Sequence, residues 1–464
     1  MTAVNVTLLG HASVLVELRG TNCLMDPVFG DPFEEGAVAS CPKRLVYPDR
    51  LPHIDILIIS HRHPDHFDIP SLARISRDCD VICPVDPLIA YTLKQLGFSR
   101  IHPVQPMAPI FSPEFELYPT KSEVKSVREF GMVFADASGV FWNQVDSFLA
   151  PETITAVANR FGRTDLLFAM YASQTFDFLE DRSTRFPFEI HARNLETARR
   201  IGPGMTVPAS AGFRFAGQAV ALNPFLFPIS RDRFITDLHR LDNGIRAEIV
   251  NPGDVLVIDA GSVEHRLGTS DAAVMVEGDT HLIHFDITQS VPALGDPNPE
   301  GYSLGTLEEA CDRTIRSALF DYASGGYVTA DKVVEAYRER RVRYAIEIVF
   351  PGGSVAHYCI VFADHHPELL TGQGEFPSAD MVHRIAASAL VDWVRNRKSY
   401  FYVRAYSRRH SLLYRLDRKD GEVHAIPYDL PDLLMHYVLN AAEGSATAAK
   451  TWVDHQLSDV GSPH

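Results

Sequence analysis

Cysteine is scarce in this sequence. Only 6 of the 464 residues are cysteine, and they are scattered along the chain. So few thiols exclude a disulfide framework and favour a reducing compartment, and we therefore expect a cytoplasmic protein. Cys79 and Cys83 lie closest together, but two thiols alone cannot form a zinc or iron–sulfur site, because such a site needs about four ligands. We interpret both as ordinary buried thiols.

Positive charge is also in short supply. The chain has 43 Lys and Arg against 59 Asp and Glu, a formal net charge of −16. Such an acidic chain binds phosphate backbones poorly, so we expect no nucleic-acid partner. No run reaches about 18 uncharged apolar residues, so we expect no membrane span, and the N-terminus lacks the pattern of a signal peptide. Apolar residues still make up 46 % of the chain, enough to form folded cores.

Short apolar runs alternate with turns from Val4 to about Asp286. Two segments have the pattern of helices, Ser71–Ser76 and Pro87–Leu96. The runs interpreted as strands are Val6–Leu9, Ala12–Leu18 and Ile54–Ser60. Later apolar runs are Gly131–Phe134, Val140–Trp142, Leu166–Met170, Val255–Asp259, Ala273–Glu277 and Thr280–Ile287. Strands and helices interleaved in this way predict a layered α/β protein with sheets at its centre.

A break follows at Ser290–Ser303, which is rich in proline and glycine. We predict a metal-binding domain at residues 1–290, a smaller α+β domain at 300–440, and a tail at 441–464. Within the second domain we expect helices at Leu304–Tyr322, Thr329–Arg341 and Ala379–Asn396, strands at Arg343–Phe350 and His357–Phe362, and a hairpin of Tyr400–Tyr406 with Ser411–Leu416.

One motif carries most of the chemical information, and it reads Ser60-His61-Arg62-His63-Pro64-Asp65-His66-Phe67-Asp68. Because it follows the apolar run Ile54–Ile59, we expect it on the loop at the end of a buried strand. His61 and His63 would face the same way in an extended segment, whereas Asp65 and His66 can turn toward a second, adjacent position. Imidazole with carboxylate suits zinc or iron and disfavours magnesium or calcium.

The H-x-H-x-D-H pattern resembles that of the metallo-β-lactamase superfamily. Leu8–Val16 is similar to the opening strand pair of that superfamily, and Met25-Asp26-Pro27 to the turn after its next strand. The resemblance implies an αββα sandwich that holds one or two metal ions at one edge of its sheets. It also implies a bridging carboxylate from a later loop, and Asp146 in Asn143-Gln144-Val145-Asp146 stands where that carboxylate is expected.

Two histidines of the superfamily's hydrolases have no counterpart here. The histidine expected before the bridging aspartate would fall in Leu117–Lys125, where Glu123 is the only anionic residue and therefore the candidate substitute. The last histidine would fall in Val207–Phe213, which contains none. The predicted metal ligands are therefore His61, His63, Asp65, His66, Asp146 and Glu123, with Asp65 also as the catalytic residue.

The layout is also similar to the lactamase-fold and C-terminal parts of CMP-N-acetylneuraminate hydroxylase, an iron-dependent monooxygenase. Besides the histidine motif, the similarity rests on Asn143–Asp146, on a turn without histidine at Pro208–Phe213, and on Phe350-Pro351-Gly352-Gly353. The Rieske part of that hydroxylase has no counterpart in these 464 residues, which contain no Cys-x₁₋₂-His pair. The resemblance therefore implies that electrons come from an external donor or from the substrate.

Two further residues lie near the expected site. His11 stands at the end of a strand, where it could reach the site, but we favour its interpretation as a hydrogen-bonded core histidine. Asp26 precedes Pro27, and we interpret it as a turn cap that supports the ligands from behind.

Three interpretations of function stay open. The first is an iron oxygenase or oxidase, with one or two irons, acting on a small polar metabolite. The second is a hydrolase in which zinc lowers the pKa of a bound water to about 7 and Asp65 orients or deprotonates that water. The third is a lactamase-fold protein that has lost activity and serves as an assembly partner.

Overall fold

The computed structural model describes residues 3–124, 127–172, 186–209, 212–226, 229–278, 290–329, 331–372, 376, 378–395, 397–428, 430–438 and 445–460. The chain forms two compact units. The first comprises residues 1–175, 185–288 and 456–464, and the second comprises residues 176–184 and 289–455. The apolar run Thr280–Ile287 lies outside the described residues.

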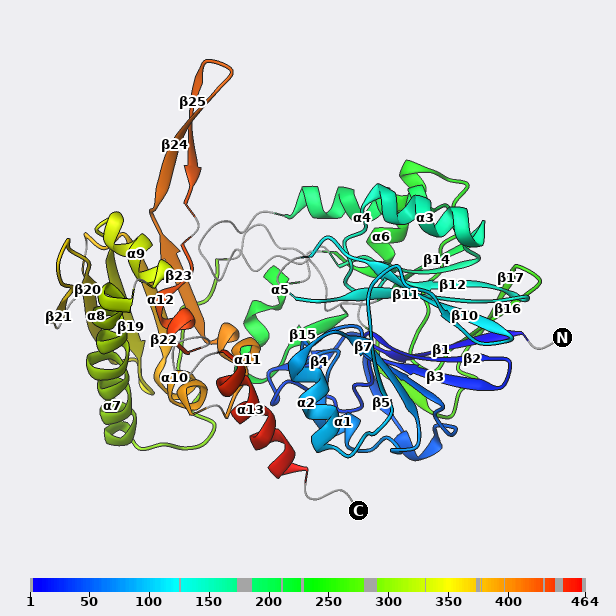
Figure 1. The fold of residues 1–464 in the computed structure, drawn as a ribbon, viewed down its shortest axis with the longest axis horizontal. Helices are drawn as coiled ribbons and strands as arrows, with labels where there is room; N and C mark the ends of the chain where they lie inside the picture. Colours follow the sequence, from blue (N-terminus) through cyan, green and yellow to red (C-terminus); the bar gives the residue numbers. More distant parts are fainter. Residues whose placement is uncertain are drawn as a thin grey trace. The chain divides into compact units, whose positions relative to one another are not determined.

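Two large sheets form the centre of the first unit (Figure 1). Among the described residues, one sheet has eight strands in the order β17-β16-β1-β2-β3-β6-β7-β8, and the other has six in the order β14-β13-β12-β11-β10-β9. The strands of the first sheet are β1 Val4–Gly10, β2 Ser13–Leu18, β3 Thr21–Met25, β6 Ile56–Ile58, β7 Asp80–Pro84, β8 Ile101–Val104, β16 Val255–Asp259 and β17 Ser262–Arg266. Those of the second are β9 Ile110–Phe111, β10 Phe115–Lys121, β11 Phe130–Asp136, β12 Gly139–Asn143, β13 Leu166–Met170 and β14 Met205–Ala209.

Helices cover the outer face of each sheet. Residues of α1 and α2 share an apolar cluster with the first sheet, whereas α3, α4 and α6 pack against strands of the second (Figure 1). The helices of this unit are α1 Ile69–Leu72, α2 Pro87–Gln95, α3 Pro151–Phe161, α4 Phe188–Ile201, α5 Asn223–Leu226 and α6 Arg231–Leu241, with short 3₁₀ turns at Pro48–Arg50 and Gly217–Leu222. Two small ladders, β4 Val38–Ser40 with β15 Phe213–Phe215 and β5 Lys43–Val46 with β18 Ala273–Glu277, complete it.

The core lies on both faces of the first sheet, because alternate residues of a strand point to opposite sides. Val4 and Val6 of β1 and Val14 and Val16 of β2 pack toward Phe134 and its neighbours in the second sheet. Leu15 and Leu57 point the other way, into the cluster that α2 closes with Ile89 and Leu93. The four layers are therefore helix, sheet, sheet and helix, and the predicted αββα sandwich is confirmed.

The second unit has its own sheet. In the described residues the strand order is β21-β20-β19-β22-β23, and a separate hairpin is formed by β24 and β25. The strands are β19 Arg343–Val349, β20 Val355–Val361, β21 Glu368–Gly372, β22 Met381–Ala386, β23 Ser407–Ser411, β24 Tyr414–Lys419 and β25 Glu422–Pro427. The helical segments are α7 Leu304–Arg313, a π-helical stretch at Thr314–Leu319, α8 Phe320–Thr329, α9 Lys332–Glu339, α10 Ala387–Val394, α11 Tyr400–Ala405 and α12 Leu433–His436. A last helix, α13 Ser445–Asp459, runs through the predicted tail.

Three sequence-based predictions of local structure are wrong. The helix expected at Ser71–Ser76 is α1, which starts earlier because the Asp68 carboxylate caps it by accepting the N–H of Ser71. The first part of Ala379–Asn396 is strand β22, because pairing with β19 and β23 overrides helical pattern. Tyr400–Ala405 is a helix capped by Ser399 rather than a hairpin strand, and β24 pairs with β25 instead.

The cysteines and the helices bear on the expectations drawn from composition. All six cysteines lie in the described part of the chain, are buried and form no disulfide. None of the helices in the described ranges is long and apolar enough to cross a membrane.

The packing between the two sheets predicts how much stability is lost when a core side chain is shortened. Leu166 of β13 is fully buried in this layer. We expect Leu166→Ala to lower the free energy of unfolding of the first unit by about 2–5 kcal/mol, because it removes apolar contacts and leaves a cavity. Leu267→Ala is the matched control, since that leucine is 72 % exposed, and it should change stability by less than about 0.5 kcal/mol. Equal losses in chemical denaturation would contradict this packing.

Candidate metal centre

The histidine motif leaves the carboxyl end of β6, which lies between β3 and β7 in the first sheet. Its backbone turns back at once, because the N–H groups of His66 and Phe67 both donate to the carbonyl of His63, at 2.9 and 2.8 Å. The side chains of Phe67, His61 and His66 are fully buried. The turn therefore gathers the ligand types of the motif on one side of the loop, as the spacing predicts.

A buried carboxylate behind the motif orients two of the imidazoles. Asp26, just after β3, accepts the N–H and the hydroxyl of Ser60 at 2.7 and 2.6 Å. Because the single proton of that hydroxyl goes to Asp26, the Ser60 oxygen at 2.9 Å accepts the Nδ1 proton of His61. His61 Nε2 is then left with a lone pair, and it faces His63 Nδ1 at 2.9 Å. The lone pair on His61 Nε2 is therefore available to a metal ion.

His66 is oriented by the same carboxylate. Its Nδ1 lies 2.9 Å from Oδ2 of Asp26, so it donates there and its Nε2 points to the opposite side. On that side, Nε2 lies 3.2 Å from Oδ2 of Asp146 and 3.6 Å from Oδ2 of Asp65. Among the described residues, neither His66 Nε2 nor Asp146 Oδ1 has a hydrogen-bond partner, although both atoms are buried.

Asp146 reaches the motif from the second sheet. It lies on the loop after β12, where Val145 adopts a left-handed backbone conformation with φ of 55°. Hydrogen bonds fix this loop, since Gln144 donates to the carbonyl of Ser147 and its side-chain oxygen accepts the N–H of Met170. The loop therefore delivers its carboxylate to the edge where β6 ends.

These side chains form three groups with the geometry of metal ligands. In each group the ligand atoms lie within 4.8 Å of one another. The groups are His61 with His63 and Asp65, His61 with His66 and Asp146, and His11 with Asp65 and His66. Five of the six predicted metal ligands are thus brought together, and the donor set of imidazoles and carboxylates suits zinc or iron.

The charges of the cluster also favour a cation. Burial lowers the pKa of His61, and the charges of His66 and His63 lower it further, so His61 is neutral. Burial alone would raise the pKa of Asp65, but the charges of His66 and His11 hold it well below its usual range. Burial opposes a charge on His66, yet Asp146 and Asp65 raise its pKa well above normal. In the absence of a metal, a proton on His66 balances the carboxylates, and a bound metal ion would displace it.

Glu123 lies outside these groups. Its side chain is 50 % exposed and pairs with Arg193 on the surface. The structure instead places Glu129 near the cluster, at the start of β11, where it is 8 % exposed. The Ser122 hydroxyl donates to it at 2.5 Å. Burial, together with the negative charge of Asp146, raises the pKa of Glu129 to about 7. Sequence reasoning missed Glu129 because its burial depends on tertiary packing, which the neighbouring residues in the sequence do not record.

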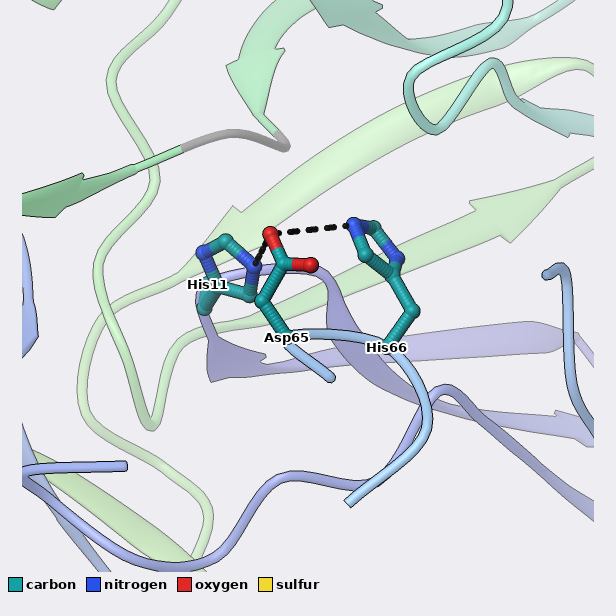
Figure 2. A group of neighbouring side chains, drawn as sticks. All are labelled: His11, Asp65 and His66. Atoms are coloured by element: carbon teal, nitrogen blue, oxygen red, sulfur yellow. Dashed lines mark ion pairs between the residues drawn. The ribbon is translucent and has the colours of Figure 1, made fainter. Parts of the chain in front are cut away.

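The sequence also singled out two residues near the site, Asp26 and His11. Asp26 does support the ligands from behind, through the hydrogen bonds described above. For His11, the predicted hydrogen bonds of a core histidine are absent, since neither ring nitrogen has a hydrogen-bond partner among the described residues. Its Nε2 instead lies 3.3 Å from Oδ2 of Asp65 (Figure 2).

Comparison with known families agrees with this architecture. Residues 5–127, which include β1 to β3 and the histidine motif, match the family model of the beta-lactamase superfamily domain. The first unit thus has the metallo-β-lactamase fold, and the family match lies in the part of it that carries the histidine motif.

Three curated relatives match parts of this chain. N-acyl-phosphatidylethanolamine-hydrolyzing phospholipase D 1 of Caenorhabditis elegans is 40 % identical over 74 residues, covering 15 % of this chain and 20 % of the relative. The 4-amino-L-phenylalanyl-[CmlP-peptidyl-carrier-protein] 3-hydroxylase of Streptomyces venezuelae is 30 % identical over 175 residues, 34 % of this chain and 32 % of the relative. A putative Rieske 2Fe-2S iron-sulfur protein of Mycolicibacterium smegmatis is 23 % identical over 246 residues, 49 % of this chain and 46 % of the relative. The matches thus span less than half the length of each relative.

Solved structures with similarity to this chain include a hydrolase and a hydroxylase. Igni18, a metallo hydrolase from Ignicoccus hospitalis, has a TM-score of 0.41 and 16 % identity, covering 56 % of this chain and 99 % of that one. CmlA, a diiron β-hydroxylase from Streptomyces venezuelae, has a TM-score of 0.38 and 20 % identity, covering 55 % of this chain and 54 % of that one.

The hydrogen bonds of Asp26 generate a testable prediction. Asp26→Asn keeps the shape but offers an N–H₂ group where Ser60 and His66 both need an acceptor. We expect metal affinity to fall about 10- to 100-fold, because the imidazoles lose their fixed orientation. Competition with a chromophoric chelator measures this, and Asp49→Asn, whose side chain is 92 % exposed, is the control. An affinity equal to that of the unmodified protein would contradict the role of Asp26.

A second prediction concerns pH. Because the pKa of Glu129 rises from 4.5 to about 7 on folding, its contribution to stability is fully present below pH 4.5 and is lost as pH rises through 7. The metal-free protein should therefore lose on the order of 2–3 kcal/mol from this group over that range.

Chemical denaturation of the chelator-treated protein at several pH values tests this. Glu129→Gln should flatten the pH dependence, and Glu123→Gln, at an exposed position, should leave it unchanged. The same slope in the protein and in the Glu129→Gln variant would contradict the burial of a titrating carboxyl there.

Proposed function

We propose that this chain is an oxygen-using iron enzyme, an oxygenase or oxidase that acts on a small polar metabolite. The observation that carries the proposal is the length of its matches. Of the three relatives, the hydroxylase and the Rieske protein match over 175 and 246 residues, whereas the phospholipase matches over 74. The donor set supports the same conclusion, because two carboxylates among three imidazoles suit iron and leave coordination positions for oxygen and substrate.

The proposed ligands are His61, His63, Asp65, His66 and Asp146, which would hold one or two irons. Iron bound there would supply the activation of dioxygen. The protein's own contribution is to keep the imidazoles oriented through Asp26 and to keep the Asp65 carboxylate ionised. An ionised Asp65 offers the metal a carboxylate oxygen.

The electrons in the proposed reaction come from a donor outside these residues or from the substrate. The 464 residues contain no Cys-x₁₋₂-His pair of the kind that holds a Rieske cluster. In this proposal either a separate electron donor or the substrate itself completes the reaction.

A zinc-dependent hydrolase is the second candidate. It is favoured by the 40 % identity with a hydrolysing phospholipase D over 74 residues. The same ligands would hold zinc, which lowers the pKa of a bound water to about 7. Asp65 would then orient or deprotonate that water.

The metal that supports turnover distinguishes the iron oxygenase from the zinc hydrolase. The full-length chain is stripped with a chelator and loaded separately with ferrous iron and with zinc, and dissolved oxygen is followed with candidate metabolites and a reductant. We expect the iron-loaded protein to consume oxygen in proportion to product. Turnover by the zinc-loaded protein under anaerobic conditions would instead establish the hydrolase.

His63→Ala serves as the matched control for this experiment. Because His63 lies on a loop at the edge of the sheets, its removal should lower metal content and turnover together while far-UV circular dichroism stays unchanged. The same amount of iron added to this variant corrects for oxygen consumed by iron in solution. Loss of the fold in this variant would mark the site as structural.

A further inference from the structure

We infer that His11 is a third side-chain ligand of the metal position that Asp65 and His66 form. This inference rests on the metal centre of the proposed function and adds to it a residue from the opening strand pair. It holds for either metal, because imidazole is a ligand of both zinc and iron.

The geometry brings three ligand atoms to one point. Figure 2 shows one oxygen of Asp65 between the rings of His11 and His66. His11 Nε2 lies 3.3 Å from this oxygen and His66 Nε2 lies 3.6 Å from it. The ligand atoms of the three side chains all lie within 4.8 Å of one another. This is the arrangement expected of two imidazoles and a carboxylate around one ion.

The surroundings of His11 give its ring no other polar partner. The residue is 5 % exposed, and neither nitrogen makes a hydrogen bond within the described part of the chain. Its nearest rings besides His66 are those of Phe33 and Phe213, at 5.4 and 6.2 Å between centroids. Leaving a buried imidazole unsatisfied costs free energy. A metal ion would satisfy the nitrogen that faces Asp65.

A buried water molecule, instead of a metal ion, is the alternative partner for the ring of His11. His11 lines a cavity of about 20 Å³ together with Gly10 and Pro252, and this volume has room for one water molecule. One water in that cavity would not account for the close approach of Nε2 to Asp65. The two explanations therefore differ in what removal of the ring does to metal binding.

The backbone at His11 is held in an unfavourable conformation. Its φ is +52°, a left-handed value that costs free energy for a residue with a side chain. The pairing of β1 with β2 is irregular between Leu8 and Gly10, and such irregularities redirect the side chains that follow. The turn thus directs the side chain of His11 toward the metal cluster. Glycine or asparagine would adopt this backbone conformation with less strain than histidine.

The test uses His11→Gly in the full-length chain, because glycine relieves the backbone and leaves a ring-sized space. Cobalt(II) is the probe, since it reports its ligands by visible absorption and by the number of shifted imidazole N–H signals in proton NMR. We expect His11→Gly to bind cobalt at least 10-fold more weakly at one position, with one shifted N–H signal fewer. Added imidazole should restore the absorption band.

Two further variants make the result unambiguous. His11→Asn tolerates the left-handed backbone and replaces His11→Gly if the glycine variant does not fold. His102→Ala is the control, because His102 is exposed on β8 and pairs with Asp80, and it should bind cobalt as the unmodified protein does.

The outcomes separate this inference from the proposed function. If the unmodified protein binds cobalt and His11→Gly binds it with the same affinity and spectrum, His11 is not a ligand and the metal centre itself stands. If a folded His11→Gly variant binds weakly but imidazole restores nothing, the role of His11 is structural and the inference is overturned. If the unmodified protein binds no metal, the proposed function fails and this inference fails with it.

Discussion

The Asp26 carboxylate accepts three hydrogen bonds from the motif after β6, and the ligands depend on them. One comes from the Ser60 backbone, one from the Ser60 hydroxyl and one from His66 Nδ1. These bonds decide which nitrogen of each imidazole keeps its lone pair. Asp26 is itself held, because its N–H donates to Ile58 and its carbonyl accepts the hydroxyl of Ser13. The pairing of β3 with β6 therefore fixes the position of Asp26, and through it the orientation of the imidazoles.

The second sheet contributes through close backbone contact. A side chain at Gly131 of β11 would come within 2.9 Å of the carbonyl oxygens of Asn143 and Gln144, so only glycine lets the loop after β12 approach. This loop carries Asp146 to within 3.2 Å of His66. A substitution at Gly131 would displace a metal-site carboxylate without touching any ligand.

The cluster concentrates opposite charges in a buried place. Asp26 is fully buried and Asp65 nearly so, and isolated carboxylates in such surroundings are costly unless they are compensated. His66 compensates them with a proton in the metal-free protein, and a metal ion does so more fully. An iron ion or a zinc ion would meet that requirement equally, so the ligand geometry supports a metal site without choosing between the two.

The sequence by itself determined a layered α/β protein, because its apolar runs encode buried strands, and the resemblance of its histidine motif implied the αββα class. His61, His63, Asp65 and His66 could be predicted as ligands because they are close in sequence, and Asp146 could be predicted through the same resemblance. Only the tertiary structure decided which carboxylates and imidazoles join them. Glu123 and Glu129 lie six residues apart, yet tertiary packing buries Glu129 and leaves Glu123 half exposed, and His11 comes to the cluster across the sheet from far earlier in the chain. Such neighbours are set by register and layer packing, which no local pattern of residues records.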